Sequence, residues 1–554
     1  MKKKIIMWLS LVLSCTILAS CGGNGGQTPQ SASQGNSEAS VQESQQAAKQ
    51  EITFVLSNEP DGLDPSVTSN SFASPFLRNC FEGLVSTDEK GGTIPGIAES
   101  FDVSEDGKTY TFHLREGLKW SDGTPLTSKD FIFTYQRMLK PETTAQYVDF
   151  LLDYVEGAKE IFETGQGTLG IKAPDDNTVV FHLTKPAPYF ASMLDMWCYY
   201  PVQEKTVTEN GDKWTLSPQT YVSNGPFKIT DMKLGESVTI EKNENYWNAE
   251  NVKLEKITFR YIKDQATALT AFESGEVDGI RSVPLADAPR LKMESKEYYM
   301  LPSYATTYYL INNTKAPYDN PKVREALNLA LDRQSLIDNV LHGNAEPAYA
   351  LVSPGYSVNG KDYAEGRGDY GIGPNGDVAK AQKLLEEAGY PGGAGFPPMQ
   401  LSYYSDPQVK VLVESLAQMW KQNLGIEVVI STEEWPVYYD HIQAMDYEVG
   451  AMGWGADYLH PMSFLPLYKT GDANNHSGYS NPEYDKLVEQ AQSETDPEKG
   501  VELMRQAEDL LMADYPLIPL YHRANTLMMK DYVKGWTMDA MSSLRFANAE
   551  VAGK

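Results

Sequence analysis

Alternating apolar and polar residues mark the first half of the chain. Over residues 101–117 the alternation is interrupted by Asp106-Gly107, a typical turn dipeptide. Period-two alternation on both sides of such a turn predicts a β-hairpin. Its apolar face would carry three residues of equal parity, Tyr110, Phe112 and Leu114. Shorter stretches of the same kind predict strands at 52–56 and 178–183.

A helix is predicted directly after this hairpin. Thr127 and Asp130 have the spacing of a capping box, in which each side chain bonds the other residue's backbone amide. Helical apolar periodicity then continues over residues 131–139. Together with the strands, this helix predicts a small α+β unit over residues 81–205.

Helix and strand patterns alternate in the second half of the chain. Three helices are predicted: one opened by Asn320-Pro321 with Val323, Leu327 and Leu331 on its apolar face, one capped by Asp377 that carries Ala381, Leu384, Leu385 and Ala388 and stops at Gly389, and one over 409–424. The last helix ends at Gly425, and an apolar strand is predicted over 426–430. Helix–glycine–strand connections build sheets flanked by helices, so the pattern predicts an α/β fold.

The N-terminus has the pattern of an export signal. Lys2–Lys4 precede a mostly apolar stretch over 5–17, which is short for a membrane-spanning helix. The Leu-Ala-Ser that precedes Cys21 resembles the bacterial lipobox, whose cysteine receives a diacylglyceryl group and becomes the new N-terminus. We therefore expect a signal peptide over 1–20 and a lipid on Cys21. The alternatives are an ordinary cleaved signal with a chance cysteine, or lipidation of Cys15.

The segment after this cysteine predicts a tether. Residues 22–49 contain no aromatic side chain and consist mainly of Gly, Ser, Gln, Ala and Asn, so they cannot bury a core. We expect residues 21–49 to be a lipidated cysteine followed by a disordered tether. The folded body would then be held near the outer face of a cell membrane, as in a Gram-positive bacterium.

Charge excludes one large class of partners. The 554 residues carry a formal charge of −28, which becomes −31 (−28 − 3) when Lys2–Lys4 leave with the signal. Nucleic acid and anionic lipid headgroups repel a chain this acidic, so binding to either through a basic patch is excluded. The length corresponds to about three to four domain-sized units. The 33 tyrosines and 9 tryptophans are enough to fill large cores and still line a cavity.

The sequence contains no recognisable catalytic or metal-binding set. Two GxGxxG matches, at 165–170 and 366–371, neither follow a clear strand nor open a helix. The seven histidines have no metal-ligand spacing, and no nucleophile is paired with a base. We expect a binding protein rather than an enzyme, without cofactor or metal. Cys80 and Cys198 lie among apolar residues, which favours two packed free thiols over one disulfide.

The glycine-rich stretch 450–465 combines an aromatic ring with a carboxylate. Trp454 lies between glycines, and Asp457 is followed by Tyr458 and flanked by apolar residues. A carboxylate in such surroundings is costly to bury unless a cation meets it. The alternative interpretation is a turn with a surface aspartate.

Several separated sequence words agree, in order, with one family. The stretch WSDGTPLTSKDF at 120–131 resembles the signature of the family 5 solute-binding proteins of peptide ABC transporters. Six more words fit the same family: FEGL at 81–84, PGIAES at 95–100, NGPF at 224–227, GEVD at 275–278, YYLINN at 308–313 and GWGADY at 453–458. The resemblance is to its oligopeptide-binding branch and covers about residues 51–485.

The resemblance implies a fold and a division of the chain. It implies an α/β, two-lobed periplasmic-binding-protein-like fold (type II, cluster C) with an extra α+β domain. The implied segments are 50–81, 206–304 and 524–554 for a hinge lobe, 82–205 for the extra domain, and 305–523 for the second lobe. The ligand would lie between the lobes of a monomer.

The resemblance also implies a function, which is the capture of oligopeptides and their delivery to an ABC permease. The carboxylate of Asp457 would receive the peptide's α-amino group, which has a pKa near ~8 and is largely cationic at neutral pH. The backbone of Trp454, Gly455 and Ala456 would pair with the peptide as an added β-strand. Three aromatic residues are further pocket candidates, with simple core packing as the alternative for each: Trp435, Tyr147 and Tyr308.

One departure from the family concerns the other end of the peptide. Some members hold its carboxylate with His or Arg, at positions that by spacing are Val409, Ile442 and Ala451 here. We therefore expect the C-terminus to be held differently or left free. Arg281 is a candidate replacement cation, with a surface arginine as the alternative. Other functions that stay open are a narrower cargo (a signalling peptide, cell-wall peptide, haem or nickel complex) and a secreted hydrolase.

Overall fold

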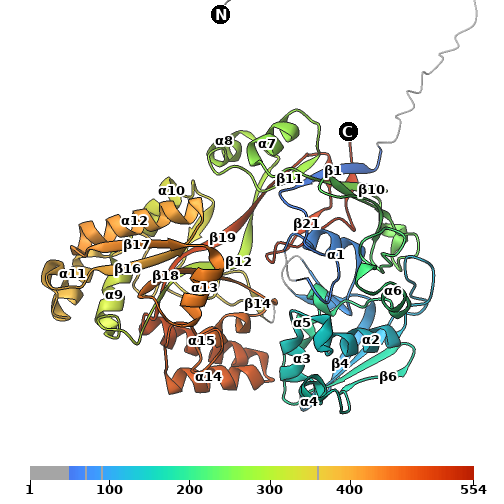
Figure 1. Ribbon diagram of the computed structural model, residues 1–554, viewed down its shortest axis with the longest axis horizontal. Coiled ribbons are helices and arrows are strands. Elements are labelled where there is room, and N and C mark those ends of the chain that lie inside the picture. The colour runs from blue at the N-terminus through green and yellow to red at the C-terminus, as the bar shows by residue number, and fades with distance from the viewer. Residues whose placement is uncertain (1–48, 69–70, 89–91, 359–360, 554) are drawn as a thin grey trace, which may run out of the picture. The chain divides into compact units, whose positions relative to one another are not determined.

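The computed structural model describes residues 49–68, 71–88, 92–358 and 361–553 (Figure 1). The predicted signal peptide, Cys21 and all but the last residue of the predicted tether lie outside the described residues. Within the described ranges, every helix is too short or too polar to cross a bilayer.

An eleven-stranded mixed sheet organises the folded body. Its order is β17-β16-β18-β12-β19-β11-β1-β10-β9-β8, and β13 pairs with β19 off this path. The strands are β1 Glu51–Leu56, β8 Phe227–Lys233, β9 Ser237–Lys242, β10 Lys256–Tyr261, β11 Gly279–Arg281, β12 Tyr298–Ile311, β13 Ala345–Pro347, β16 Met399–Tyr404, β17 Val428–Glu433, β18 Val449–Gly455 and β19 Leu517–Met529. The long antiparallel pair β12 and β19 connects the two halves of the sheet, because β12 pairs with β18 and β19 pairs with β11 (Figure 1).

Helices accompany both halves of this sheet. They are α1 Ser74–Cys80, α7 Gln265–Glu273, α8 Ala288–Glu294, α9 Pro321–Leu329, α10 Arg333–Asn339, α11 Val378–Glu387, α12 Pro407–Leu424, α13 Trp435–Gln443, α14 Pro482–Ser493 and α15 Pro497–Ala513. The predicted caps are confirmed: Asn320 accepts from the Lys322 amide and Asp377 from the Lys380 amide. Helix α9 ends before Leu331, so the prediction that Leu331 belongs to it is wrong.

Leu331 lies outside α9 because a new helix begins directly after it. Asp332 caps a new helix by accepting from the Ser335 amide, so the chain turns between α9 and α10. Leu331 is nevertheless fully buried, which explains why it fits the apolar pattern.

The strand predicted over 426–430 is displaced. Pairing with β16 starts only at Val428, opposite Met399, and continues to Glu433. The segment forms the edge of the sheet, so Val429 and Ile430 are 40% and 39% exposed. Apolar composition cannot distinguish an edge strand from an interior one, since the difference depends on which strand lies beyond it.

A separate four-stranded sheet forms the predicted α+β unit. Its order is β4-β5-β7-β6, from Ala98–Val103, Thr109–Leu114, Thr178–His182 and Ile171–Asp175. The hairpin β4–β5 is confirmed, with Tyr110, Phe112 and Leu114 buried. The capping box is also confirmed at the start of α2 Ser128–Met138. Helices α3 Val148–Tyr154, α4 Ala158–Thr164, α5 Phe190–Met193 and α6 Glu204–Asn210 complete the unit. The predicted boundaries of the lobes and the extra domain stay a prediction.

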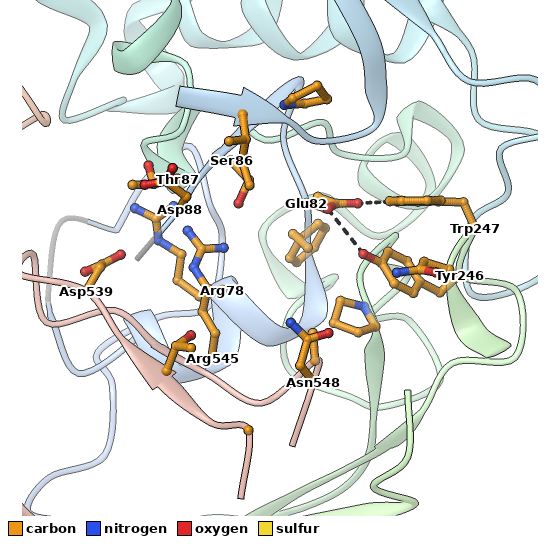
Figure 2. A pocket seen from close by; sticks show the side chains of 18 of the residues that line it. Arg78, Glu82, Ser86, Thr87, Asp88, Tyr246, Trp247, Asp539, Arg545 and Asn548 are labelled. Atoms are coloured by element: carbon orange, nitrogen blue, oxygen red, sulfur yellow. Dashed lines mark hydrogen bonds between the residues drawn. The ribbon is translucent and has the colours of Figure 1, made fainter. Parts of the chain in front are cut away.

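Charged side chains line a cavity beside the end of α1. The cavity has a volume of about 380 Å³, and in it Glu82 accepts from Trp247 Nε1 at 2.6 Å and from the Tyr246 hydroxyl at 3.2 Å. Figure 2 shows these side chains and the two hydrogen bonds. Beside Glu82, Arg78 and Arg545 share one buried carboxylate, that of Asp195, at 2.8 and 3.3 Å. Asp195 thus forms ion pairs with both arginines, whereas Glu82 accepts hydrogen bonds from neutral donors.

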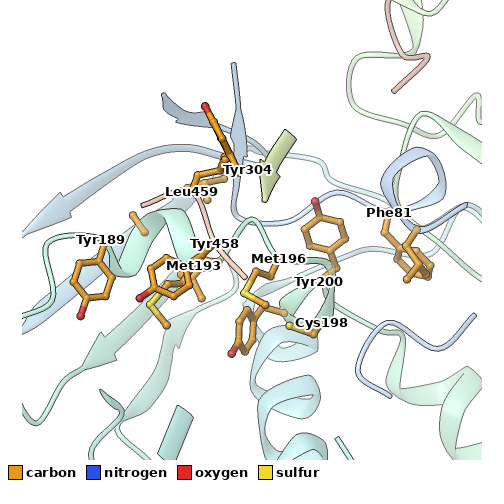
Figure 3. Packing of buried hydrophobic residues seen from close by; sticks show 14 of the residues in the cluster. Phe81, Tyr189, Met193, Met196, Cys198, Tyr200, Tyr304, Tyr458 and Leu459 are labelled. Carbon is orange, nitrogen blue, oxygen red and sulfur yellow. The ribbon is translucent and has the colours of Figure 1, made fainter. Parts of the chain in front are cut away.

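One continuous apolar core contains both cysteines of the described residues. Figure 3 shows Cys198 near Met196 and Tyr200, and Met193 near Tyr458, all in one cluster. Cys80 and Cys198 are both buried and free, which confirms the prediction of two packed thiols. Burial raises the pKa of both thiols, so they stay protonated at neutral pH.

Candidate functional site

The strand β18 leaves part of one edge open. It pairs with β12 from Val449 to Gly455, but with β16 only at Val449 and Gly450. Among the described strands, none pairs with the second edge between Ala451 and Gly455. This stretch of backbone can therefore accept an additional strand.

Backbone parity shows which groups face the open edge. The Ala456 amide donates to the carbonyl of Tyr304, a residue of β12, at 2.8 Å. Antiparallel pairing alternates, so the N–H and C=O of Gly453 and Gly455 point away from β12. Ala451 has the same parity, and its carbonyl accepts from the Tyr438 hydroxyl instead of from a strand, at 2.7 Å.

Asp457 follows the end of this strand. Its amide donates to Ser463 Oγ at 2.8 Å, which fixes the backbone. Its carboxylate accepts no hydrogen bond, and has no cation within 4.0 Å, among the residues that the structure describes. Burial raises the pKa of Asp457 to about 7, so the group titrates near neutral pH.

A cavity of about 360 Å³ contains this carboxylate. Tyr147 and Phe150 contribute to it from the start of α3, and Trp454 and Tyr458 from the other side. Three more carboxylates line it, those of Asp149, Asp153 and Asp472, and no lysine or arginine is among its lining residues in the described ranges. The excess of negative charge suits a cationic amine.

The predicted site residues divide into groups. Tyr147, Trp454 and Asp457 line the same cavity, and Gly455 and Ala456 connect two of them along the chain. Trp435 is 46% exposed and contacts Tyr404 edge-on at 5.1 Å, outside that cavity.

The other two candidates are more deeply placed. Tyr308 is buried in the core opposite Met452. Arg281 donates to the Ser542 carbonyl at 3.4 Å, and its Nη1 is buried without a hydrogen-bond partner among the described residues. Burial lowers the pKa of Arg281.

A second cavity, of about 390 Å³, contains a residue that the sequence analysis missed. Arg523, on β19, lines it together with Tyr404 and Val409 from the half of the sheet that contains β16, and with Ser282 and Val283, which follow β11 in the other half. No local motif marks this arginine, because it approaches β18 across β12. The available signal was a cation in the otherwise mostly apolar strand 517–529.

Two histidines near these strands, the half-buried His460 and the buried His522, are neutral. Burial lowers the pKa of both His460 and His522 to about 3. His460 stacks on Tyr189 with ring centroids 4.9 Å apart, and His522 Nδ1 lies 2.9 Å from Thr306 Oγ1. In the described ranges, no group of three or more His, Cys, Asp or Glu side chains is placed to hold a metal ion.

Comparison with known proteins relates this geometry to one family. The family model "Bacterial extracellular solute-binding proteins, family 5 Middle" matches residues 92–476. The "Oligopeptide-binding protein OppA" of Bacillus subtilis (strain 168) is 34% identical over 565 residues, which cover 99% of each chain.

Two solved structures are similar over most of their length. The unliganded open form of the periplasmic murein tripeptide binding protein MppA has a TM-score of 0.78 and 29% identity, covering 91% of this chain and 98% of that one. Haemophilus influenzae OppA in complex with RPPGFSPFR has a TM-score of 0.71 and 33% identity, covering 91% of this chain and 99% of that one.

Proposed function

Because the chain belongs to the bacterial extracellular solute-binding proteins of family 5, we propose that it captures oligopeptides outside the cytoplasm and delivers them to an ABC permease. Membership confirms the predicted family and the α/β binding-protein fold of cluster C, and it makes the chain a solute-binding protein rather than an enzyme. The names of the relatives support a peptide cargo, since OppA is an oligopeptide-binding protein and MppA binds a murein tripeptide.

The observation that carries the proposal is the unpartnered carboxylate of Asp457 at the end of an open strand edge. A peptide's α-ammonium group is a cation with a pKa near ~8, and a charge-assisted hydrogen bond to a carboxylate is about twice as strong as a neutral one. Enclosure between the lobes would remove water from both groups, so each needs the other.

The open edge of β18 supplies the second part of the recognition. A peptide that runs antiparallel to it can pair with the N–H and C=O of Gly453 and Gly455. These bonds do not depend on the peptide's side chains, so they allow a broad range of sequences. Tyr147 and Trp454 would flank the first residues and Trp435 later ones. Ala456 would join the edge to Asp457, while the roles of Tyr308 and Arg281 stay predictions.

The membrane anchor forms a further part of the proposal. We propose a lipid on Cys21 and a tether over 22–49 that holds a monomeric receptor at the outer face of a Gram-positive cell membrane. Cells fed labelled palmitate should label the wild-type chain, and Cys21→Ser should abolish the label and release the protein into the medium. Labelling that survives this substitution would contradict it.

Calorimetry tests the central claim. Peptides of three to eight residues should bind the full chain, and N-acetylation or Asp457→Asn should each weaken binding about 10–100-fold. Asp176→Asn is the control, because this carboxylate is exposed and paired with Lys129. Equal affinity for free and acetylated peptides would exclude the role of Asp457. Mass spectrometry of ligand that co-purifies with the protein distinguishes a broad peptide set from a single narrow cargo.

A further inference from the structure

Arg523 is an exposed cation whose side chain makes few hydrogen bonds with the described residues. Its Nε donates to Thr307 Oγ1 at 2.9 Å. Within the described ranges, the two terminal nitrogens have no hydrogen-bond partner, and no carboxylate lies within 4.0 Å. By contrast, Arg324 and Arg333 are buried and donate through several nitrogens to backbone carbonyls. Arg523 therefore has no comparable structural role.

The absence of a side chain at Gly453 positions the guanidinium. Arg523 Nη2 lies where it would collide with a Cβ atom on Gly453. The φ angle of Gly453 is not in the left-handed region, so backbone conformation does not require glycine there. The glycine instead leaves space for the guanidinium against β18, next to the backbone groups that face the open edge.

The side chains around Arg523 do not pair with its guanidinium, so its positive charge is available to a ligand. The titratable side chains that share the cavity with Arg523 are Asp406, Tyr404 and Tyr521. The carboxylate of Asp406 caps α12, where it accepts from the amides of Gln408 and Val409 at 2.8 and 2.9 Å. The nearby His522 is neutral at physiological pH. Arg523 is thus the cation that this cavity offers.

We propose that Arg523 binds the C-terminal carboxylate of a short peptide, an inference that rests on the proposed function. A peptide whose amine meets Asp457 and which runs antiparallel to β18 brings its other end toward Gly453. Four residue steps of ~3.3 Å place these two points roughly 13 Å apart, which matches an extended peptide of about four residues. Arginine suits this task because its planar fork can bind a carboxylate with two hydrogen bonds.

The test compares free-acid and C-terminally amidated alanine-based peptides of three to six residues. Calorimetry at pH 7.5 uses the full chain, freed of endogenous ligand, as wild type, Arg523→Gln, Arg523→Lys and Arg290→Gln. The last is a matched loss of one positive charge, since Arg290 is exposed on α8 and paired with Glu273. We expect Arg523→Gln to weaken the free-acid tetrapeptide about 10–100-fold, amidation to weaken wild-type binding by a similar factor, and the two changes not to add.

Gly453→Ala provides a second route if Arg523→Gln fails to fold. It displaces the guanidinium through one methyl group, so it should weaken free-acid peptides more than amidated ones. Arg523→Lys should retain part of the preference for a free carboxylate, and Arg290→Gln should change nothing.

Two results would overturn the inference: equal wild-type affinity for free-acid and amidated peptides, or equal weakening of both by Arg523→Gln. Its failure is distinguishable from that of the proposed function. If N-acetylation weakens binding while amidation does not, only the role of Arg523 is excluded. If acetylation has no effect, the role of Asp457 is excluded, and if no peptide binds, the proposed function fails.

Discussion

The amide of Asp457 donates to Ser463 Oγ at 2.8 Å, while the carboxylate of the same residue has no partner among the described residues. The backbone is thus fixed and the charged group is left free. A carboxylate held in this way is preorganised for an incoming cation, since no existing bond has to break first. The ligand-free protein bears the unfavourable desolvation of this group, and peptide binding would relieve it.

Peptide affinity should depend on pH through this carboxylate. Its pKa of about 7 means that Asp457 gains a proton as the pH falls below neutrality, and the protonated form cannot pair with an ammonium group. Affinity should be highest between about pH 7 and 8, should fall up to about tenfold per pH unit below 7, and should fall again above the peptide's amine pKa near ~8. Calorimetry between pH 5.5 and 9.5 measures this profile.

Proton release provides the control for that profile. At pH 6.5, binding should release a fraction of a proton from Asp457, which is detected by repeating the titration in buffers of different ionisation enthalpy. In Asp457→Asn the acid limb of the profile should disappear. An affinity that is constant between pH 5.5 and 7 in the wild type would contradict the assignment.

The same group should reduce the stability of the ligand-free protein. The pKa of Asp457 is higher in the folded state than the unfolded value near ~3.9, so the folded state binds the proton more tightly. The resulting destabilisation is absent below about pH 4, grows up to about pH 7 and is then constant. Asp457→Asn should therefore stabilise the ligand-free protein at pH 8 by about 1–2 kcal/mol, after allowance for solvent at the cavity mouth.

Thermal unfolding checks this prediction. The melting temperature of Asp457→Asn should exceed that of the wild type at pH 8 by a few degrees, and the difference should vanish near pH 4. A variant that is less stable than the wild type at both pH values would show that the carboxylate has a structural role instead.

Local signals in the sequence predicted much of the fold correctly. The capping box of Thr127 and Asp130 and the hairpin turn at Asp106-Gly107 involve residues a few positions apart, so their physics is contained in the local sequence. Local chemistry marked Asp457 as a carboxylate that is costly to bury, and the family resemblance predicted its role toward a peptide's amine. Only the three-dimensional structure shows that this carboxylate has no partner among the described residues.

What the sequence could not predict depends on distant neighbours. The open edge of β18 exists because β16 pairs with it only as far as Gly450 and otherwise pairs with β17. Arg523 lies seventy positions after Gly453 in the chain but beside it in space, with β12 between their strands. Neither relationship leaves a periodic pattern, so neither could be inferred from residue spacing.

The buried carboxylate of Asp195 should be essential for stability. It pairs with Arg78 at 2.8 Å and Arg545 at 3.3 Å and accepts from Thr87 Oγ1 at 2.7 Å and the Tyr200 hydroxyl at 3.0 Å. Burial alone would raise its pKa, but the two arginines outweigh burial and lower it. Asp195→Asn leaves the buried Arg78 and the half-buried Arg545 without this counter-charge, so we expect a loss of about 3–5 kcal/mol in the free energy of unfolding.

The pH dependence of this loss follows from the lowered pKa. Such a carboxylate stabilises the fold above its unfolded pKa near ~3.9, and the contribution disappears as the pH falls through the folded-state value. Urea unfolding should thus show the largest difference between wild type and Asp195→Asn at neutral pH and a smaller one near pH 3. Asp176→Asn, in an exposed pair with Lys129, should change stability by less than about 1 kcal/mol. Equal effects of both substitutions would refute the structural role of Asp195.

Strand addition along β18 should produce a period of two in the ligand. The backbone N–H and C=O of Gly453 and Gly455 point to the open edge, while those of Trp454 point to β12. Only alternate residues of an antiparallel peptide can therefore exchange hydrogen bonds with the strand. Methylation of single backbone nitrogens along a tetrapeptide should weaken binding about tenfold at the pairing positions, the equivalent of one lost hydrogen bond, and much less at the others. Calorimetry with the methylated set measures this directly, and peptides bearing the same methyl group on a side chain control for added bulk. A uniform loss at every position would mean that the peptide is held by its ends and side chains, and that the open edge of β18 is not its docking strand.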